Sequence, residues 1–125
     1  RHGRAPGLTI ILFTLDESTY ARDLAPLAGH WPCLLIGPPW WFHDSPQGIR
    51  RYFESVVETA GFANLAGFND DTRAFLSIPA RHDVWRREVC GFLARLVAEH
   101  RLDRRDAEVI AADLSYHAAK RSYRL

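Results

Sequence analysis

Apolar residues form three short continuous runs, and stretches with apolar residues at helical spacing separate and follow them. The runs lie at residues 8–15, 32–37 and 65–68. Continuous runs without polar alternation are typical of strands that are buried on both faces, as in parallel sheets. Each run therefore predicts one strand of a parallel sheet.

Four helices are predicted from the spacing of apolar residues. They lie at residues 19–28, 48–60, 83–100 and from 103 onward. The second helix opens at Ser45-Pro46, a capping residue followed by a proline that suits the first helical turn. Gly29 and Gly61 are expected to end the first two helices, because glycine is common just past a helix C-terminus. Asp103 is expected to cap the last helix.

The predicted order is strand, helix, strand, helix, strand, helix, helix. Such alternation indicates parallel strands joined by right-handed helical crossovers. Three strand–helix units cannot close a (β/α)8 barrel, which needs eight units and about 250 residues. We therefore expect the α/β class, with residues 1–125 forming a single partial domain without an internal boundary, the last portion of a larger fold.

The composition is that of an ordinary globular protein, because 47% of the 125 residues are hydrophobic and 25% are charged. Sixteen basic and 15 acidic residues leave a formal charge of +1, so nucleic-acid and membrane-surface binding receive no support. No apolar run approaches the roughly 20 residues of a membrane-spanning helix. Cys33 and Cys90 lie on apolar stripes, so both are expected in the core. Two cysteines do not make a disulfide framework in a chain of this size, which favours a reducing cytoplasm as the location of the protein.

Ligands of parallel α/β folds bind at the carboxyl ends of the strands. These ends fall at residues 14–17, 37–44 and 69–73. At the second end, Trp40 and Trp41 are adjacent in sequence, so they cannot both face the core. One indole could line a pocket and donate a hydrogen bond to a ligand hydroxyl. The alternative, favoured on these residues alone, is a packed aromatic corner under a loop.

Two carboxylates and an arginine follow the third predicted strand. Asp71 and Arg73 are two residues apart, so they point the same way in an extended chain. A carboxylate beside a guanidinium stays ionised and can act as a base or a metal ligand. The arginine can hold a substrate carboxylate or a developing enediolate. A capped loop with a surface ion pair is an equally good interpretation.

The remaining histidines and the common sequence motifs give weaker evidence for a functional site. His82-Asp83 could support a site, but a helix cap is the commoner use of such a pair. His2, His30, His100 and His117 lack metal-ligand spacing. No glycine-rich dinucleotide motif, phosphate-binding loop, nucleophile elbow or metalloprotease motif occurs.

Four segments occur together in a specific order. They are Pro38–Pro46, Asn69–Ser77, Arg81–Asp83 and Tyr116–Arg121. This combination resembles the C-terminal part of the uronate isomerase (glucuronate isomerase) family, and the resemblance extends from about Leu8 to the end of the chain. It implies the amidohydrolase superfamily and a (β/α)8 TIM barrel, in which the three predicted strands are the sixth, seventh and eighth.

The resemblance also implies an activity and residue roles. The family consists of aldose–ketose isomerases that interconvert D-glucuronate with D-fructuronate and D-galacturonate with D-tagaturonate, so a hexuronate is the expected partner. Asp71 would be a ligand to a divalent metal, usually zinc, and a proton-transfer group. Arg73 would contact the substrate and stabilise the enediolate. Trp40 and Trp41 match a tryptophan pair of which one member contacts the sugar acid.

One feature of the family is absent from this chain. The family's metal-binding His-x-His motif has no counterpart, since His2-Gly3-Arg4 has the wrong partner and position. One carboxylate does not hold zinc tightly, because such sites use three or four protein ligands. The chain has no methionine. We therefore expect a fragment of a longer parent enzyme, and we expect this fragment to be inactive and to fold poorly alone. The parent could be a homo-oligomer, and the number of its subunits is left open.

Two alternatives remain at this stage. The first is a non-catalytic interaction module that is derived from such a barrel and associates through its open sheet edges. The second is a metal-dependent hydrolase of the same superfamily, which would also use Asp71. The paired tryptophans argue against the hydrolase, because they resemble the isomerases specifically.

Overall fold

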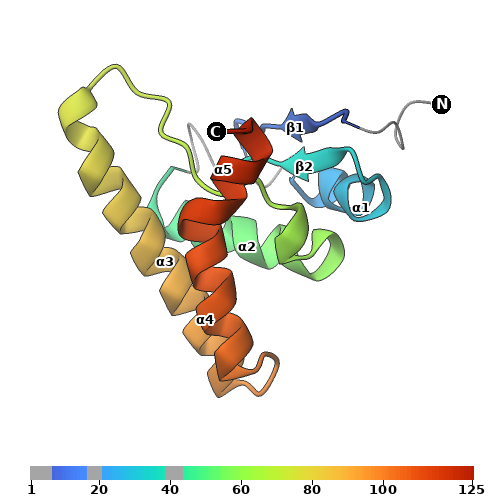
Figure 1. Ribbon diagram of the computed structural model, residues 1–125. Coiled ribbons are helices and arrows are strands. Elements are labelled where there is room, and N and C mark those ends of the chain that lie inside the picture. The colour runs from blue at the N-terminus through green and yellow to red at the C-terminus, as the bar shows by residue number, and fades with distance from the viewer. Residues whose placement is uncertain (1–6, 17–20, 39–43) are drawn as a thin grey trace.

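The chain forms an α/β structure that is rich in helix and carries a small parallel sheet (Figure 1). This computed structural model describes residues 7–16, 21–38 and 44–125. Its strands and α-helices are β1 (Ile10–Leu12), α1 (Arg22–His30), β2 (Leu34–Ile36), α2 (Pro46–Ala60), α3 (Ile78–Ala98), α4 (Arg104–Ala112) and α5 (Ala118–Tyr123). Short 3-10 turns lie at Phe62–Asn64 and Phe75–Ser77, and a π-helical turn, Asp113–His117, joins α4 to α5.

The sheet confirms the predicted parallel pairing of the first two strands. Ile10 lies opposite Leu34, and Leu12 lies opposite Ile36. β1 is much shorter than the predicted run 8–15, because β2 offers only three residues for pairing. In the described ranges, β1 pairs with no strand other than β2.

The third predicted strand, residues 65–68, was wrong as a full strand. Only Leu65 forms a parallel bridge, with Ile36, and the Ala66 N–H donates to the Ile36 carbonyl at 2.8 Å. Gly67 then adopts a φ of +79°, which takes the chain out of the extended conformation. A Cβ on Gly67 would lie 2.8 Å from the backbone nitrogen of Ala119, so the C-terminal helix approaches the chain closely there.

The start and end signals of α2 were predicted correctly. Ser45 caps the helix, since its Oγ accepts a hydrogen bond from the Gly48 N–H at 3.0 Å. Gly61 follows the helix with a φ of +76°. Asp103 likewise caps α4, accepting from the Arg105 N–H at 2.8 Å.

Two helix boundaries differ from the prediction. α1 continues through Gly29 to His30, so this glycine does not end the helix. A Cβ at Gly29 would lie 2.4 Å from the Thr59 carbonyl oxygen, so the glycine permits α1 to pack closely on α2. α3 begins at Ile78 rather than at residue 83, and Asp83 therefore lies inside the helix, where it accepts a hydrogen bond from Arg87 at 2.7 Å.

The core lies where α2, α3 and the C-terminal helices meet (Figure 1). Trp85 of α3 stacks on Phe68 at 5.0 Å between ring centroids and lies 5.2 Å from Phe53 of α2. Its indole N–H donates to the Leu114 carbonyl in the π-helical turn at 3.3 Å. These contacts tie the helices to the segment that follows the parallel bridge.

The two cysteines differ in environment. Cys33 is buried, as predicted, whereas Cys90 is exposed, so its predicted place in the core was wrong. Cys90 follows Val89, which belongs to the buried stripe of α3, and one residue turns the side chain about 100° around the helix. No helix in the described part of the chain is long and apolar enough to cross a membrane.

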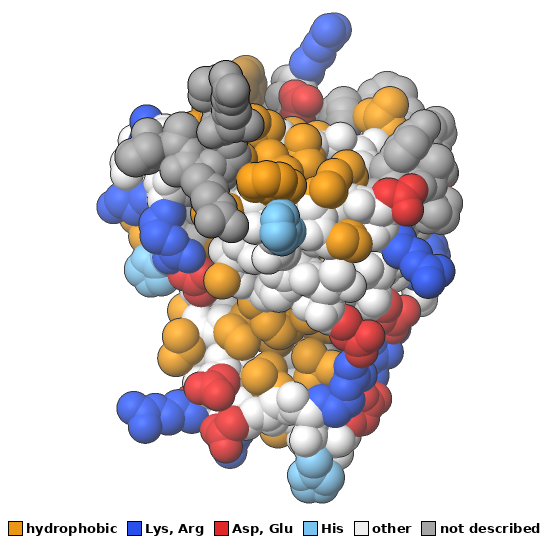
Figure 2. Space-filling view, turned by 90° about the vertical axis from the view of Figure 1, so that its right-hand side faces the viewer, with side chains coloured by type: hydrophobic (Ala, Val, Ile, Leu, Met, Phe, Trp, Pro, Cys, Tyr) orange, Lys and Arg blue, Asp and Glu red, His pale blue; other side chains and the backbone are white. Residues whose placement is uncertain are grey.

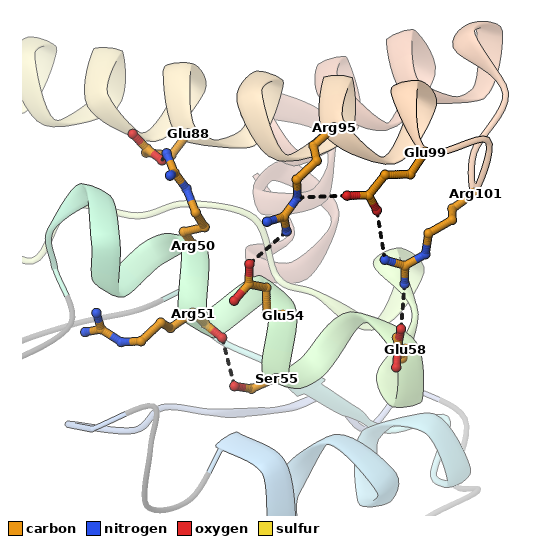
Figure 3. Close-up of polar contacts among 9 residues, drawn as sticks. All are labelled: Arg50, Arg51, Glu54, Ser55, Glu58, Glu88, Arg95, Glu99 and Arg101. Carbon is orange, nitrogen blue, oxygen red and sulfur yellow. Dashed lines mark hydrogen bonds and ion pairs between the residues drawn. The ribbon is translucent and has the colours of Figure 1, made fainter.

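Ion pairs link the exposed edges of α2 and α3 (Figure 3). Arg95 bonds Glu54 at 2.8 Å, and Arg101, just after α3, bonds Glu58 at 2.5 Å. Glu99 lies between the two arginines and pairs with Arg101 at 3.3 Å. Most of these side chains are substantially exposed, so each pair is worth less than about 1 kcal/mol.

Candidate functional site

A cavity of about 440 Å³ lies at the carboxyl ends of β1, β2 and the bridged segment. The described side chains that line it are Phe13, Pro38, Asn69, Asp70 and Asp71. Because β1, β2 and the bridge at Leu65 run parallel, the residues that follow them meet at one edge of the sheet. The cavity is therefore the candidate active site.

Asp71 and Arg73 occupy different parts of this region. Asp71 lines the cavity and is exposed, whereas Arg73 is exposed and is not among the lining residues. These two described residues do not form an ion pair with each other, and the ion pair of this region joins Asp70 to Arg81. Between them, the Thr72 Oγ1 accepts a hydrogen bond from the Ala74 N–H at 3.1 Å, which closes a small turn.

Trp40 and Trp41 lie outside the described residues, so their predicted contact with a ligand stays a prediction. The described residues on either side belong to the same region. Pro38 lines the cavity, and Asp44 forms an ion pair with Arg81. The tryptophan pair is thus connected in sequence to two residues of the candidate site.

Arg81 brings together two carboxylates that sequence reasoning did not pair. Its Nη1 donates to Asp70 Oδ1 and its Nη2 donates to Asp44 Oδ2. The Asp70 side chain is only 2% exposed, and its Oδ2 has no hydrogen-bond partner within the described part of the chain. The sequence signal was the Arg81–Asp83 segment itself, whose resemblance to the family did not reveal which carboxylates the arginine would contact.

Two tyrosines hold the backbone and side chains around the cavity. The Tyr52 hydroxyl of α2 donates to the Gly37 carbonyl, just after β2, at 2.8 Å, and burial raises the pKa of Tyr52 far above its usual range. The Tyr123 hydroxyl of α5 donates to Asn69 Oδ1 at 3.1 Å, and burial raises the pKa of Tyr123 as well. Both tyrosines therefore serve as neutral hydrogen-bond donors.

His82 packs beside the candidate site rather than capping a helix. Its ring meets Phe68 edge-on at 4.8 Å between centroids. Burial lowers the pKa of His82, and the negative charge of Asp70 opposes this shift. The predicted pair with Asp83 is replaced by an Asp83–Arg87 bond within α3.

Among the described residues, Asp71 is the one side chain that was predicted to bind a metal ion. Within residues 7–16, 21–38 and 44–125, no group of three or more histidine, cysteine, aspartate or glutamate side chains could hold a metal. Asp71 offers a single carboxylate, whereas tetrahedral zinc sites use three or four protein ligands. The described residues alone therefore do not fit a bound zinc ion.

Comparison with known proteins places this segment in a family. A family model for glucuronate isomerase matches residues 8–123. The chain is 68% identical over 125 residues to the uronate isomerase of Sphingopyxis alaskensis and 67% identical over the same length to that of Phenylobacterium zucineum. All of this chain is aligned in both cases, together with 27% and 26% of the respective relatives.

Solved structures agree with the sequence comparison. Glucuronate isomerase from Caulobacter crescentus matches with a TM-score of 0.95 and 64% identity, over 99% of this chain and 26% of that one. Uronate isomerase from Thermotoga maritima matches with a TM-score of 0.88 and 28% identity, over 93% of this chain and 26% of that one. The chain spans about a quarter of the length of these relatives and, on this evidence, belongs to the glucuronate isomerase family.

Proposed function

We propose that the chain is part of a uronate isomerase that interconverts D-glucuronate with D-fructuronate and D-galacturonate with D-tagaturonate. The observation that carries this proposal is the glucuronate isomerase match over residues 8–123, in which Asp71 lies at the cavity. Identities of 68% and 67% to two uronate isomerases support it. The chain itself contributes one partial domain, and the isolated chain is expected to be inactive.

The same proposal assigns the strands to a barrel. β1, β2 and the segment 65–68 would be the sixth, seventh and eighth strands of a (β/α)8 barrel, followed by the C-terminal helices. Support comes from the parallel order of β1, β2 and Leu65. Hydrophobic side chains left exposed around β1 (Leu8, Ile10, Phe13 and Leu15) give further support, because a preceding strand would cover them. Figure 2 shows exposed hydrophobic side chains in its upper part, the level at which Figure 1 places the sheet.

The residues of this chain supply the proton chemistry in the proposed reaction. Asp71, at the cavity, would move a proton between C2 and C1 of the sugar acid, which requires a positioned carboxylate near both carbons. Arg73 would bind the substrate and stabilise the negative charge of the enediolate. Trp40 and Trp41 would supply a contact to the sugar ring or its hydroxyls.

A divalent metal, usually zinc, is implied for the longer enzyme, with Asp71 as one ligand. The other ligands must come from outside the described residues, because no group of three ligands gathers among these.

A non-catalytic interaction module is the second candidate function. The observation that favours it is the open edge of β1 with its exposed hydrophobic side chains, an arrangement that invites pairing with another chain. A start codon and promoter just before Arg1 would favour this module. A continuous upstream reading frame that encodes His-x-His would favour the enzyme.

The test is an isomerase assay of the longer enzyme that contains this chain, with D-glucuronate and D-galacturonate as substrates. Asp71→Asn should lower kcat by about 10²–10⁴-fold, the usual contribution of a positioned acid–base group. Arg73→Met should lower kcat by about 10²–10³-fold. An enzyme without isomerase activity when metal is supplied would contradict the proposal and favour the module.

A further inference from the structure

One guanidinium connects the two loops that border the candidate active site. Arg81 lies in the first turns of α3. It donates to Asp70, which follows the bridged segment, and to Asp44, which follows β2 and precedes α2. The three residues are far apart in sequence, by 11 and 37 positions, so the contact joins loops that the backbone does not hold together.

Burial makes Asp70 dependent on this arginine. The Asp70 side chain is 2% exposed, and the Arg81 and Asp44 side chains are 22% and 25% exposed. Among the residues that the structure describes, Asp70 Oδ2 has no hydrogen-bond partner, so Arg81 supplies the compensation for a nearly buried carboxylate. Removing one partner of a buried charge pair is costly, because the other charge stays buried without compensation.

Arg81 lies on a part of α3 that is packed firmly against its neighbours. Trp85 lies one helical turn further along α3, is buried, and stacks on Phe68, two residues before Asp70. Its indole N–H bonds the Leu114 carbonyl, which fixes α3 against the C-terminal helices. The start of α3 and the end of the bridged segment are therefore held at a constant separation.

Beyond Asp70, little else holds the loop. The chain from Asp71 to the start of α3 forms a long loop at the edge of the molecule (Figure 1), with a 3-10 turn at Phe75–Ser77. Phe75 and Leu76 at its far end are exposed, Leu76 to 98%. Asp70 with its arginine therefore helps to set the position of Asp71 at the cavity, together with the hydrogen bond from Tyr123 to Asn69.

We propose that Arg81 is a positioning residue for the active site: by binding Asp70 and Asp44 together, it holds the loop carrying Asp71 and Arg73 in register with the loop after β2. This inference rests on the proposed isomerase function for its effect on activity. A single planar guanidinium suits the task, because its fork can donate to two carboxylates at once, whereas an ammonium is a compact point charge.

The test compares variants of the longer enzyme that contains this chain. Arg81→Met should lower kcat by about 10–100-fold, the scale expected for a misplaced catalytic group. The KM should also rise, because the same loop carries the substrate-binding Arg73, but by a smaller factor than kcat falls. Arg81→Lys should recover only part of the loss. Arg87→Met is the matched control, since Arg87 lies on the same helix but pairs within it and is 75% exposed; its kcat should stay within about twofold.

A second readout follows the loop itself. Hydrogen–deuterium exchange at residues 69–77 should be at least about tenfold faster in Arg81→Met than in the parent enzyme, with exchange in the middle of α3 unchanged. If Arg81→Met does not fold, Asp44→Asn replaces it, because this change keeps the buried Asp70–Arg81 pair; a kcat loss of about 3–10-fold is then expected.

The two proposals fail in different ways. A parent enzyme without isomerase activity, in which Arg81→Met still accelerates exchange at residues 69–77, contradicts the proposed function and supports the positioning role. An active parent whose Arg81→Met variant keeps kcat within twofold, or loses no more than Arg87→Met, overturns the positioning role. Equal acceleration of exchange throughout α3 also overturns it, because Arg81 would then serve general stability only.

Discussion

The helical half of the molecule and its sheet edge differ in how far their side chains are partnered within the described chain. In the helical half, formed by α2, α3 and α4, aromatic rings pack on one another and ion pairs cross the exposed edge (Figure 3). At the sheet edge, Ile10 and Phe13 are largely exposed, and β1 has only β2 beside it in the described residues. The comparison teaches that the helices bury most of one another's apolar side chains, whereas several side chains around β1 stay exposed in the described part of the chain.

The largest expected effect is on the core of the helical half. Trp85→Ala should lower the free energy of unfolding by about 3–5 kcal/mol, because it removes a buried indole that contacts Phe53 and Phe68. Urea unfolding of the longer enzyme that contains this chain, followed by circular dichroism, measures this loss. Trp85→Phe serves as a control and should lose less, because only the hydrogen bond to Leu114 and part of the volume disappear. Equal losses for both variants would contradict this account.

Hydrogen exchange on the isolated chain tests the comparison directly. Amides in the middle of α2 and α3 should exchange at least about 100-fold more slowly than those of β1, because well-packed elements open rarely. In the longer enzyme proposed above, β1 should then be strongly protected, whereas the protection of α3 should change little. Uniform protection across the isolated chain would show that the sheet edge is complete without further chain.

Gly29→Ala tests the close packing of α1 on α2. The added methyl would lie 2.4 Å from the Thr59 carbonyl oxygen, and such overpacking should cost about 1–3 kcal/mol in unfolding free energy. Gly91→Ala in α3 is the matched control, because a Cβ there has no neighbour within 4 Å. The control should be neutral or stabilising by up to about 1 kcal/mol, since alanine favours helix. A stabilised Gly29→Ala variant would exclude the close approach.

Tyr123→Phe breaks a contact between the helical half and the candidate site. The variant loses the hydrogen bond to Asn69 Oδ1, so the unfolding free energy should fall by about 1 kcal/mol. Tyr116→Phe, which changes an exposed ring, should have no measurable effect. Thermal unfolding of both variants measures the difference, and an equal response would show that the Asn69 bond contributes nothing.

The smallest effect concerns the ion pair across the π-helical turn. Hydrogen bonds from Arg121 lower the pKa of Asp113 from its ordinary 3.8. The pair therefore stabilises fully above that ordinary pKa, and its contribution is lost as the pH falls through the lower folded value. Because Arg121 is 60% exposed, Asp113→Asn should cost less than about 1 kcal/mol at pH 7. Urea titrations should show this cost shrink as the pH falls below 3.8; a constant cost would contradict the linkage.

Local patterns predicted those features that depend on neighbours in sequence. Ser45 at the start of α2 and Asp103 at the start of α4 cap their helices as expected, because capping uses backbone N–H groups two or three residues away. The parallel pairing of β1 and β2 also followed from the pattern, since continuous apolar runs separated by a helix leave few other arrangements. The resemblance of four motifs agreed with the family match.

Tertiary structure decided the features that depend on distant partners. Gly29 continues a helix because α2 lies against it, although the local signal predicts a helix end. The third predicted strand is only a single bridge at Leu65 in the structure, because Gly67 turns the chain where the C-terminal helix approaches it closely. The pairing of Arg81 with Asp44 spans 37 residues and could not be read from spacing.

By itself, the sequence determined the order of the helices and of the first two strands, the caps of α2 and α4, and the family, because each depends on residue types at short or recognisable spacing. Only the tertiary structure decided that Asp71 lines the cavity and that Arg73 does not line it. It also decided that Arg81 contacts both Asp70 and Asp44, which lie in separate loops. The physical reason is that contacts between distant residues depend on how helices pack, and packing is a property of the whole fold rather than of any local run.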